Sequence, residues 1–372
     1  MSSNKFILKR IPDLNWSLII LVIIMSSIGF AILYSAAEGS FDPWASKQII
    51  RFAIFFPIMI LIALVDIKVW YRLSYVIYAA VLLALIYTDF FGVTAMGATR
   101  WIRIGPLNIQ PSEIAKLSTV FALAHYFHNV SAVNIRRMSF IIPPLIMLFL
   151  PFALVVKQPD LGTSLIILMV GGAMFFAAGV QIWKFVVLFI SGIISMPFAW
   201  LYLHDYQKKR VLAFLSPESD PLGDGYNILQ SKIAIGSGGL TGKGFLKGTQ
   251  SQLSFLPEKQ TDFIFTMLAE EFGFIGSVVV IILYAIILMY GVWIAINSKN
   301  HFGRMMAIGI TTILFVHVFV NIAMVMGLIP VVGAPLPLLS YGGTIMMTML
   351  IAFGFLLNAD LYSEEVFDKN VN

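Results

Sequence analysis

The chain has 372 residues, of which 59% are hydrophobic and 12% charged, with a mean hydropathy of +0.90; a soluble domain is roughly 45–50% apolar and about 25% charged, so the composition excludes an ordinary soluble protein and indicates a polytopic membrane protein. The sequence contains no cysteine, which excludes disulfides, thiolate nucleophiles and cysteine metal sites. The net charge of +5 does not predict a nucleic-acid partner, because basic residues beside apolar spans act as topology signals and contact anionic lipid head groups.

Ten segments are apolar over about the 20 residues that a helix needs to cross a bilayer. In chain order they cover residues 15–36, 46–65, 71–90, 112–128, 139–156, 161–179, 184–203, 265–296, 305–328 and 341–358. The first is longer than the apolar core of a signal peptide, so we expect it to remain in the protein as a span. The predicted fold class is therefore all-α, a polytopic membrane protein with about ten transmembrane helices.

The distribution of Lys and Arg over the short connections predicts the orientation. One side holds Lys5, Lys9, Arg10, Lys68, Arg72, Arg136, Arg137, Lys184, Lys299, Arg304 and Lys369. The other side holds Lys47, Arg51, Arg100, Arg103, Lys116 and Lys157. The first set is larger and includes both termini, which we therefore expect in the cytoplasm. The one long loop, residues 204–264 between the seventh and eighth spans, is expected on the outer side, within a single transmembrane domain of residues 1–372.

The external connection after the third span, residues 97–116, carries side chains suited to the membrane surface. The Trp101 indole suits the head-group level, and the guanidiniums of Arg100 and Arg103 suit lipid phosphates. We therefore expect an interfacial segment here.

The sequence Gln110-Pro111-Ser112-Glu113 predicts the start of the fourth span, because proline suits the first helical position and a carboxylate suits the first turn. Lys116 lies three residues after Glu113, on the same face of the helix. Two interpretations stay open for this pair. It is either helix-start chemistry or a buried ion pair that lines a cavity, since ionisable groups inside spans are usually functional.

Two further external connections have unusual backbone. Gln158-Pro159-Asp160 repeats the proline–acid helix start before the sixth span, although three residues are too few to show an internal repeat. Residues 329–344 are apolar but contain Pro330, Pro335, Pro337, Gly333, Gly342 and Gly343. Irregular backbone at membrane depth is tolerated only inside protein or along a cavity, so we expect a re-entrant wall or floor of a site.

The long loop combines a basic, glycine-rich half with an acidic half. Its basic run, residues 208–210, suits a solvated or head-group-facing patch and equally suits a pyrophosphate, while residues 226–235 predict a short interfacial helix. Between residues 236 and 248, six glycines accompany Lys243 and Lys247, and such backbone lets amides and cations approach an anion.

Carboxylates follow at Glu258, Asp262, Glu270 and Glu271, where the eighth span begins. The structural alternative for Asp262 is a helix N-cap, and for the three glutamates it is helix-start charge and interfacial solvation. These acids nevertheless meet cations and flexible backbone at the membrane surface, which favours chemistry on a lipid-borne substrate.

Several other reaction classes lack their motifs. The five histidines are scattered without a His-Glu-x-x-His pattern, the Gly-Lys-Gly at 242–244 lacks P-loop spacing, and no serine has a recognisable histidine partner. Acid–base chemistry by carboxylates with cationic assistance remains, and glycosyl transfer from a polyprenyl-pyrophosphate sugar fits it. A transporter with intramembrane acids stays open as the alternative.

Five runs in order carry a resemblance to a known family. They are GATRWIRIG (97–105), QPSEIAK (110–116), QPDLGT (158–163), the glycine-rich and acidic run 236–276, and PLPLLSYGGT (335–344). They resemble the motifs of the SEDS family (shape, elongation, division and sporulation proteins) over essentially the whole chain. Residues 248–252 favour the RodA (elongation) branch over the FtsW (division) branch. Gln260 stands where the family often has histidine, so a proton-transfer role for that histidine has no counterpart here.

The resemblance implies a peptidoglycan glycosyltransferase with ten membrane helices in the bacterial cytoplasmic (inner) membrane. It implies that lipid II is polymerised into glycan strands at the outer face. The implied partners are a class B penicillin-binding protein, which performs the peptide crosslinking, and the elongation machinery. The family's essential aspartate falls on Asp262, and its glutamate and lysine positions fall on Glu113 and Lys116.

On this basis we expect Asp262 to deprotonate or orient the 4-hydroxyl of the acceptor N-acetylglucosamine, which attacks the anomeric carbon of the donor N-acetylmuramic acid with inversion. The candidates for binding substrate and the leaving undecaprenyl pyrophosphate are Glu113, Lys116, Arg100, Arg103, Lys243, Lys247 and Glu258. No metal ligands and no certain cofactor are predicted, and a divalent cation (Mg²⁺ or Mn²⁺) stays open as an additional stabiliser. The alternatives are a lipid II flippase or transporter, which would use the same cavity without making a bond, and a scaffold for the penicillin-binding partner.

Overall fold

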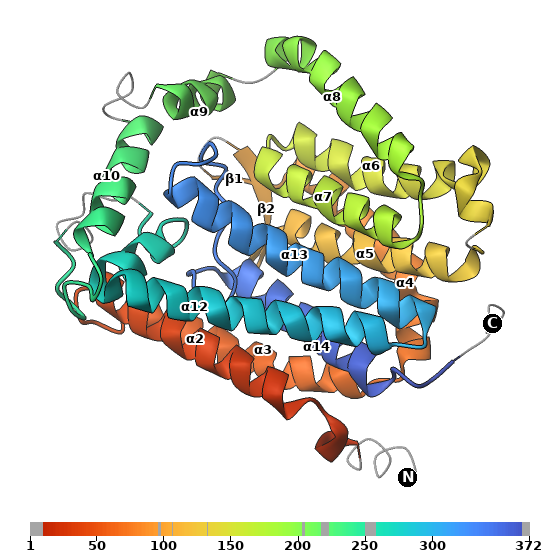
Figure 1. Ribbon diagram of the computed structural model, residues 1–372, viewed down its shortest axis with the longest axis horizontal. Helices are drawn as coiled ribbons and strands as arrows, with labels where there is room; N and C mark the ends of the chain where they lie inside the picture. Colours follow the sequence, from red (N-terminus) through yellow and green to blue (C-terminus); the bar gives the residue numbers. More distant parts are fainter. Residues whose placement is uncertain are drawn as a thin grey trace.

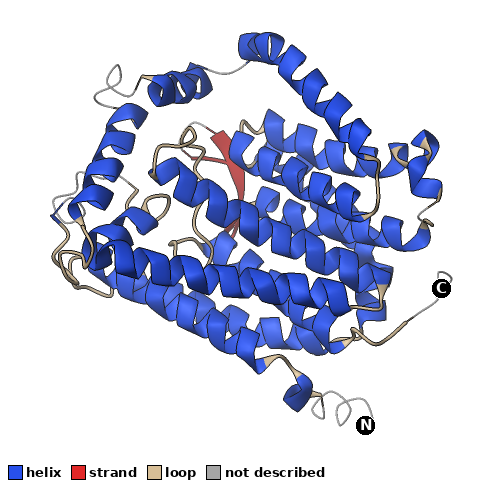
Figure 2. Ribbon diagram, viewed as in Figure 1, coloured by secondary structure: helices blue, strands red, loops and turns tan. Residues whose placement is uncertain are grey.

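The computed structural model describes residues 10–95, 98–105, 107–131, 133–202, 205–216, 223–249 and 258–366. These residues are mostly helical, with one small sheet (Figure 2). The helices are η1 (Ile11–Asp13), α2 (Trp16–Ala36), α3 (Ala45–Leu64), α4 (Ile67–Phe91), α5 (Pro111–Asn129), η2 (Asn134–Arg136), η3 (Met138–Phe140), α6 (Ile142–Lys157), α7 (Leu161–Ala177), α8 (Ile182–Tyr202), α9 (Asp205–Leu215), α10 (Asp224–Ser237), α12 (Ile264–Asn297), α13 (His301–Val325) and α14 (Gly343–Leu361). The strands β1 (Val93–Ala95), β2 (Ala98–Ile104) and β3 (Leu107–Ile109) form an antiparallel sheet in that order.

Each of the ten predicted spans falls on one helix, α2 to α8 and α12 to α14. By length and hydropathy, seven of the described helices can cross a membrane: α2, α3, α4, α6 with its preceding turn, α12, α13 and α14. Helix α7 and the apolar part of α8 are shorter, and α5 is polar for a span but mostly buried by its neighbours. The prediction of a polytopic membrane protein is confirmed, and the number of ten spans stays a prediction.

The sheet departs from the all-α prediction. Residues expected only as an interfacial segment form a hairpin, in which Ile102 pairs with Ile109 and Ile104 pairs with Leu107. Apolar residues alternate with Trp101 and Arg103 along β2, which is the two-residue period of a strand. This alternation indicates a strand, whereas the all-α prediction rested on long apolar runs alone.

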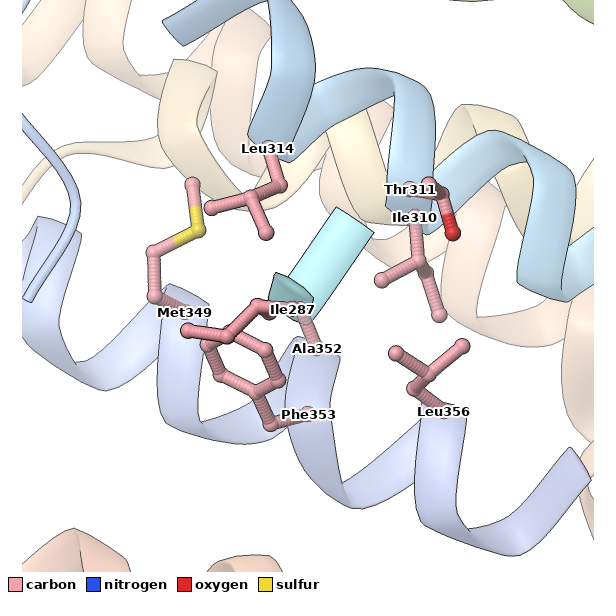
Figure 3. A pocket seen from close by; sticks show the side chains of 8 residues that line it. All are labelled: Ile287, Ile310, Thr311, Leu314, Met349, Ala352, Phe353 and Leu356. Atoms are coloured by element: carbon pink, nitrogen blue, oxygen red, sulfur yellow. The ribbon is translucent and has the colours of Figure 1, made fainter. Parts of the chain in front are cut away.

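Helix α13 lies at the centre of the bundle (Figure 1) and packs against α5, α7, α12 and α14, while α14 packs along α3. The interior is close-packed. A void of about 10 Å³, room for about one water molecule, lies between α12, α13 and α14. Figure 3 shows the side chains that line it, which are apolar except for Thr311. The two ends of the described chain meet, because Asn15 donates to Asp360 at 3.1 Å and Arg10 contacts Glu365 at 3.3 Å.

Helix α8 leans away from the bundle, and α9 and α10 arch over the end that also holds the sheet (Figure 1). Helix α10 covers residues 226–235, which confirms the predicted helix, while its position at the membrane interface stays a prediction. It packs on α9, α12 and α13. The basic run at 208–210 lies on α9, for which no helix was predicted.

A break in α12 explains the glycine-rich loop. At Gly273 the backbone has φ 65° and ψ −160°, so carbonyls before it and amides after it lose their helical partners. The loop supplies replacements: the amides of Lys243 and Gly244 donate to the carbonyls of Glu270 and Glu271, and the amides of Phe274 and Ile275 donate to the carbonyls of Gly239 and Leu240. The amides of Lys243 and Gly244, expected to face an anion, thus bind α12 instead.

Two glycines allow this approach of loop and helix. A Cβ atom at Gly242 would lie 2.1 Å from the Glu271 carbonyl oxygen, and one at Gly273 would lie 2.3 Å from the Gly242 nitrogen. Both residues also have positive φ, where side chains are disfavoured. Gly242 in the loop and Gly273 in α12 are therefore needed for backbone packing.

We expect Gly273→Ala to destabilise the protein by about 2 kcal/mol or more, from the positive φ and the steric clash together. Thermal melting in detergent measures the effect. Gly172→Ala is the matched control, because a Cβ atom there meets nothing within 4 Å. Equal melting temperatures for the two variants would contradict the packing role of Gly273.

Candidate active site

Asp262 lies in the turn that precedes α12, and α13 holds this turn in place. The Nδ2 atom of Asn321 donates to the Asp262 carbonyl at 2.9 Å and to the Ala334 carbonyl at 2.7 Å. The N-cap of α12 is Phe263, and no side chain caps this helix. Asp262 is therefore not a helix cap, and that structural alternative is wrong.

The irregular segment between α13 and α14 forms one wall around Asp262, as the sequence predicted. The Ser340 hydroxyl donates to the Thr261 carbonyl at 2.6 Å, and the Tyr341 amide donates to the Gln260 carbonyl at 2.8 Å. Gly333 has φ 74°, and a Cβ atom there would lie 3.5 Å from Oδ2 of Asp262. The backbone of the segment thus closely approaches the carboxylate.

The surroundings of Asp262 raise its pKa to about 6 from an ordinary value of 3.8. Burial is the largest cause, because it disfavours the charged form, and the Glu258 carboxylate adds repulsion. The Arg210 guanidinium on α9 acts in the opposite direction and lowers this pKa. Asp262 as a whole residue is partly exposed, while its carboxyl group is buried.

Glu113 and Lys116 form a buried ion pair, which confirms that part of the second interpretation, while its cavity stays a prediction. The Lys116 ammonium lies 2.8 Å from Glu113 and 2.6 Å from Nε2 of His317. Because an ammonium can only donate, Nε2 accepts, and Nδ1 of His317 faces the Pro335 carbonyl at 3.3 Å. The pair therefore supports the same irregular segment that borders Asp262.

The two proline–acid helix starts meet in space. Asp160 caps α7, and its Oδ2 atom accepts from Nε2 of Gln110 at 3.0 Å. The Arg100 guanidinium donates to the Gln158 carbonyl at 3.0 Å and to the Pro159 carbonyl. Arg100 thus joins the hairpin to the start of α7 and does not point freely toward a phosphate.

The other predicted cations have different surroundings. The Lys243 ammonium lies 2.8 Å from the buried Glu270 carboxylate and donates to the Thr249 hydroxyl at 2.7 Å, so it holds the loop on α12. Lys247 and Arg103 are exposed. The substrate-binding roles of Lys243, Lys247 and Arg103 stay predictions.

Residues that the predicted site did not include complete the surroundings of Asp262. Arg210 carried a signal, since the basic run was recognised as suitable for a pyrophosphate. Gly333 belongs to the irregular segment that was expected to border a site, whereas Asn321 and His317 were not singled out, because their roles depend on α13 and that segment coming together. For Asn321 and His317, the available hint was that polar residues within an apolar span often have a function.

Among the described residues, no group of three or more His, Cys, Asp or Glu side chains could hold a metal ion. Asp262 and Glu258 are close enough to interact electrostatically, but two carboxylates do not complete a magnesium site without phosphate oxygens from a substrate.

The chain matches the family model for FtsW, RodA and SpoVE, described as cell cycle protein, over residues 12–365. It is 42% identical over 351 residues to the peptidoglycan glycosyltransferase MrdB of Escherichia coli strain K12, covering 93% of this chain and 92% of that relative. It is 38% identical over 367 residues to the stage V sporulation protein E of Bacillus subtilis strain 168, covering 95% and 98%.

Solved structures are similar over the same length. A structure of a peptidoglycan synthase complex, described as coordinating polymerization and crosslinking, matches with a TM-score of 0.82 and 29% identity, over 96% of this chain and 99% of that chain. The rod shape determining protein RodA of Thermus thermophilus matches with a TM-score of 0.71 and 26% identity, over 94% and 97%.

We expect Lys116→Met to destabilise the protein by about 3–5 kcal/mol, because it leaves the Glu113 carboxylate buried without its cation. The double variant Glu113→Gln with Lys116→Met should recover much of this loss. Thermal melting measures both. Lys157→Met is the control: it removes an ion pair to Asp89 whose lysine side chain is 69% exposed, and should cost about 1 kcal/mol or less. A double variant as unstable as Lys116→Met would contradict the pairing.

Proposed function

The chain belongs to the FtsW, RodA and SpoVE family, and with that premise we propose how its residues carry out the reaction. It is a peptidoglycan glycosyltransferase of the RodA type, which polymerises glycan strands for cell-wall elongation. We propose that lipid II is its substrate and that Asp262 is the general base. The observation that carries the proposal is the buried Asp262 carboxyl of a partly exposed residue, with a pKa raised to about 6, beside the Arg210 guanidinium.

A base is most effective when its pKa lies near the working pH. With a pKa of about 6, Asp262 is ionised at neutral pH but holds a proton better than an ordinary aspartate. It removes the proton from the acceptor hydroxyl while that oxygen bonds to the donor's anomeric carbon. The bond from that carbon to the diphosphate breaks, and its electron pair leaves with the diphosphate.

The leaving diphosphate needs a cation close to the reaction centre. Arg210 meets this requirement, because both its guanidinium and the Asp262 carboxylate lie within 4 Å of a Cβ position at Gly333. Arg103 and Lys247 are exposed and stay candidates for outer contacts to substrate. Arg100 and Lys243 would have to exchange their present partners, so we assign them to holding the hairpin and the loop.

We propose that Glu113 and Lys116 act by fixing the irregular segment, through His317, rather than by touching substrate. Glu258 contributes by raising the pKa of Asp262. The whole chain would work as one transmembrane domain, with residues 204–264 as its extracytoplasmic loop.

We propose a location in the bacterial cytoplasmic membrane, with both termini in the cytoplasm and the site at the outer face. The meeting of both ends of the described chain at one end of the bundle supports this orientation. A class B penicillin-binding protein and the elongation machinery are the proposed partners. The similarity to a synthase complex that coordinates polymerization and crosslinking supports the first of these.

The experiment that tests this proposal measures glycan polymer formed from lipid II by the protein with its penicillin-binding partner, whose transpeptidase is blocked. We expect Asp262→Asn to lower the rate by about 10²–10⁴-fold, the usual loss on removing a general base. Asp13→Asn, an exposed aspartate near the start of the described chain, should leave it unchanged. Melting confirms folding. Polymer formed at the wild-type rate by folded Asp262→Asn would contradict the role of Asp262 as general base. Transfer of lipid II across vesicle membranes without polymer would favour the flippase.

The pH dependence gives a second prediction with a defined sign. The polymerisation rate should rise with pH through an apparent pKa of about 6, because Asp262 must be ionised to act. Glu258→Gln removes a negative charge near Asp262 and should lower the pKa of Asp262, so the rise in rate should move to lower pH. Arg210→Gln removes a positive neighbour and should move it to higher pH while also slowing the reaction. Lys209→Gln, an exposed neighbour of Arg210, is the control. Shifts in the same direction for the Glu258 and Arg210 variants would contradict the assignment.

A further inference from the structure

A cleft of about 360 Å³, with a mostly apolar lining that includes one arginine, opens beside the Asp262 turn. It lies between α3, the β2–β3 hairpin and the start of α14. Its lining includes Arg51, Phe55, Trp101, Thr261, Tyr341 and Met347. The cleft therefore shares Thr261 with the Asp262 turn, but its other walls come from elements that do not carry the base.

Arg51 provides a fixed cation in this cleft. Its guanidinium contacts Oε1 of Gln48 at 3.4 Å and the Tyr341 hydroxyl at 3.3 Å, and it lies 4.7 Å from the centre of the Tyr341 ring. Among the described residues, no carboxylate lies within ion-pair distance of it. A guanidinium has five N–H donors, so these two contacts leave donors for an anion.

The backbone is shaped to the guanidinium. A Cβ atom at Gly343 would lie 3.3 Å from Cζ of Arg51, so a side chain at this position would crowd the cation. Nε2 of Gln48 donates to the Ser340 carbonyl at 2.9 Å, and the Ser340 hydroxyl donates to the Thr261 carbonyl. Arg51 is thus joined to the turn of Asp262 through two intervening residues.

Along α3, the lining of the cleft changes from a charged to an apolar side chain. Arg51 lies about 9 Å from the start of the helix at 1.5 Å per residue, and Phe55 lies one turn deeper. Met347 is also apolar, whereas Trp101 and Thr261 offer an aromatic face and a hydroxyl for sugars. This set of apolar residues, a cation and sugar-binding groups matches the parts of a polyprenyl chain, a diphosphate and a disaccharide.

We propose that the Arg51 cleft binds the diphosphate of the acceptor lipid; this rests on the function proposed above. The donor's diphosphate is bonded to the reacting carbon and must lie beside Asp262, where Arg210 is. The acceptor's diphosphate is two sugar rings away from its reacting hydroxyl, and Arg51 lies in the neighbouring cleft, joined to the Asp262 turn through Gln48 and Ser340. The two arginines thus serve the two lipid-linked substrates.

The test compares Arg51→Gln with Lys47→Gln, which removes a cation from the exposed face of the same helix one turn away. Polymerisation is measured against lipid II concentration. Arg51→Gln should raise the half-saturating concentration about tenfold, as expected for loss of one charge-assisted contact, and leave the maximal rate and the strand length at saturation unchanged. Lys47→Gln should match wild type. A lower maximal rate, or shorter strands at saturation, would overturn the acceptor assignment.

Binding of lipid II to the Asp262→Asn protein separates this inference from the proposed function, because it needs no catalysis. Adding Arg51→Gln should weaken that binding even if wild type makes no polymer, and unchanged binding would overturn the inference. Repeating it in vesicles with and without phosphatidylglycerol distinguishes a phospholipid head group from the substrate. A loss of binding independent of phosphatidylglycerol supports the substrate site, and an effect seen only with that lipid overturns it.

Discussion

Irregular backbone inside a membrane protein persists only where its amide and carbonyl groups are hydrogen-bonded within the protein, and the rest of the site depends on this constraint. Helix α12 breaks at Gly273, and the glycine-rich loop replaces the lost hydrogen bonds. The segment between α13 and α14 is irregular too, and Asn321 and Ser340 bind it to the Asp262 turn. Asp262 is therefore held by backbone contacts that no single helix could provide.

That scaffold leaves the Asp262 carboxylate with little water and one nearby cation. Burial and Glu258 raise its pKa, and Arg210 limits the increase, so the group is a stronger base than an exposed aspartate while still ionised at neutral pH. The buried ion pair of Glu113 and Lys116 does not contact Asp262 in this way; it contacts the irregular segment, through His317 and the Pro335 carbonyl. The pKa of Asp262 thus depends on how the chain packs around it as well as on the charged residues nearby.

The sequence predicted the positions of the helices well because long apolar runs are sufficient to specify them. It also located Asp262, since the acids and glycines of the long loop and the family motifs converge there. The sequence analysis wrongly expected the amides of Lys243 and Gly244 to face an anion. They bind the carbonyls before the break at Gly273, and this contact exists only once the loop has folded against α12. Arg210 was counted in a basic run and Arg51 as a topology signal, and only tertiary contacts place Arg210 near Gly333 and Arg51 near Gly343.

The central claim is that the fold turns Asp262 into a dehydrated base, and infrared titration of the protein with ¹³C-labelled aspartate measures this most directly. The account predicts a carboxyl signal that titrates with a pKa of about 6 and is missing from Asp262→Asn. A difference between the two proteins that titrates near the ordinary value of 3.8 would contradict the account, because Asp262 would then be solvated and its surroundings would not prepare it for proton transfer.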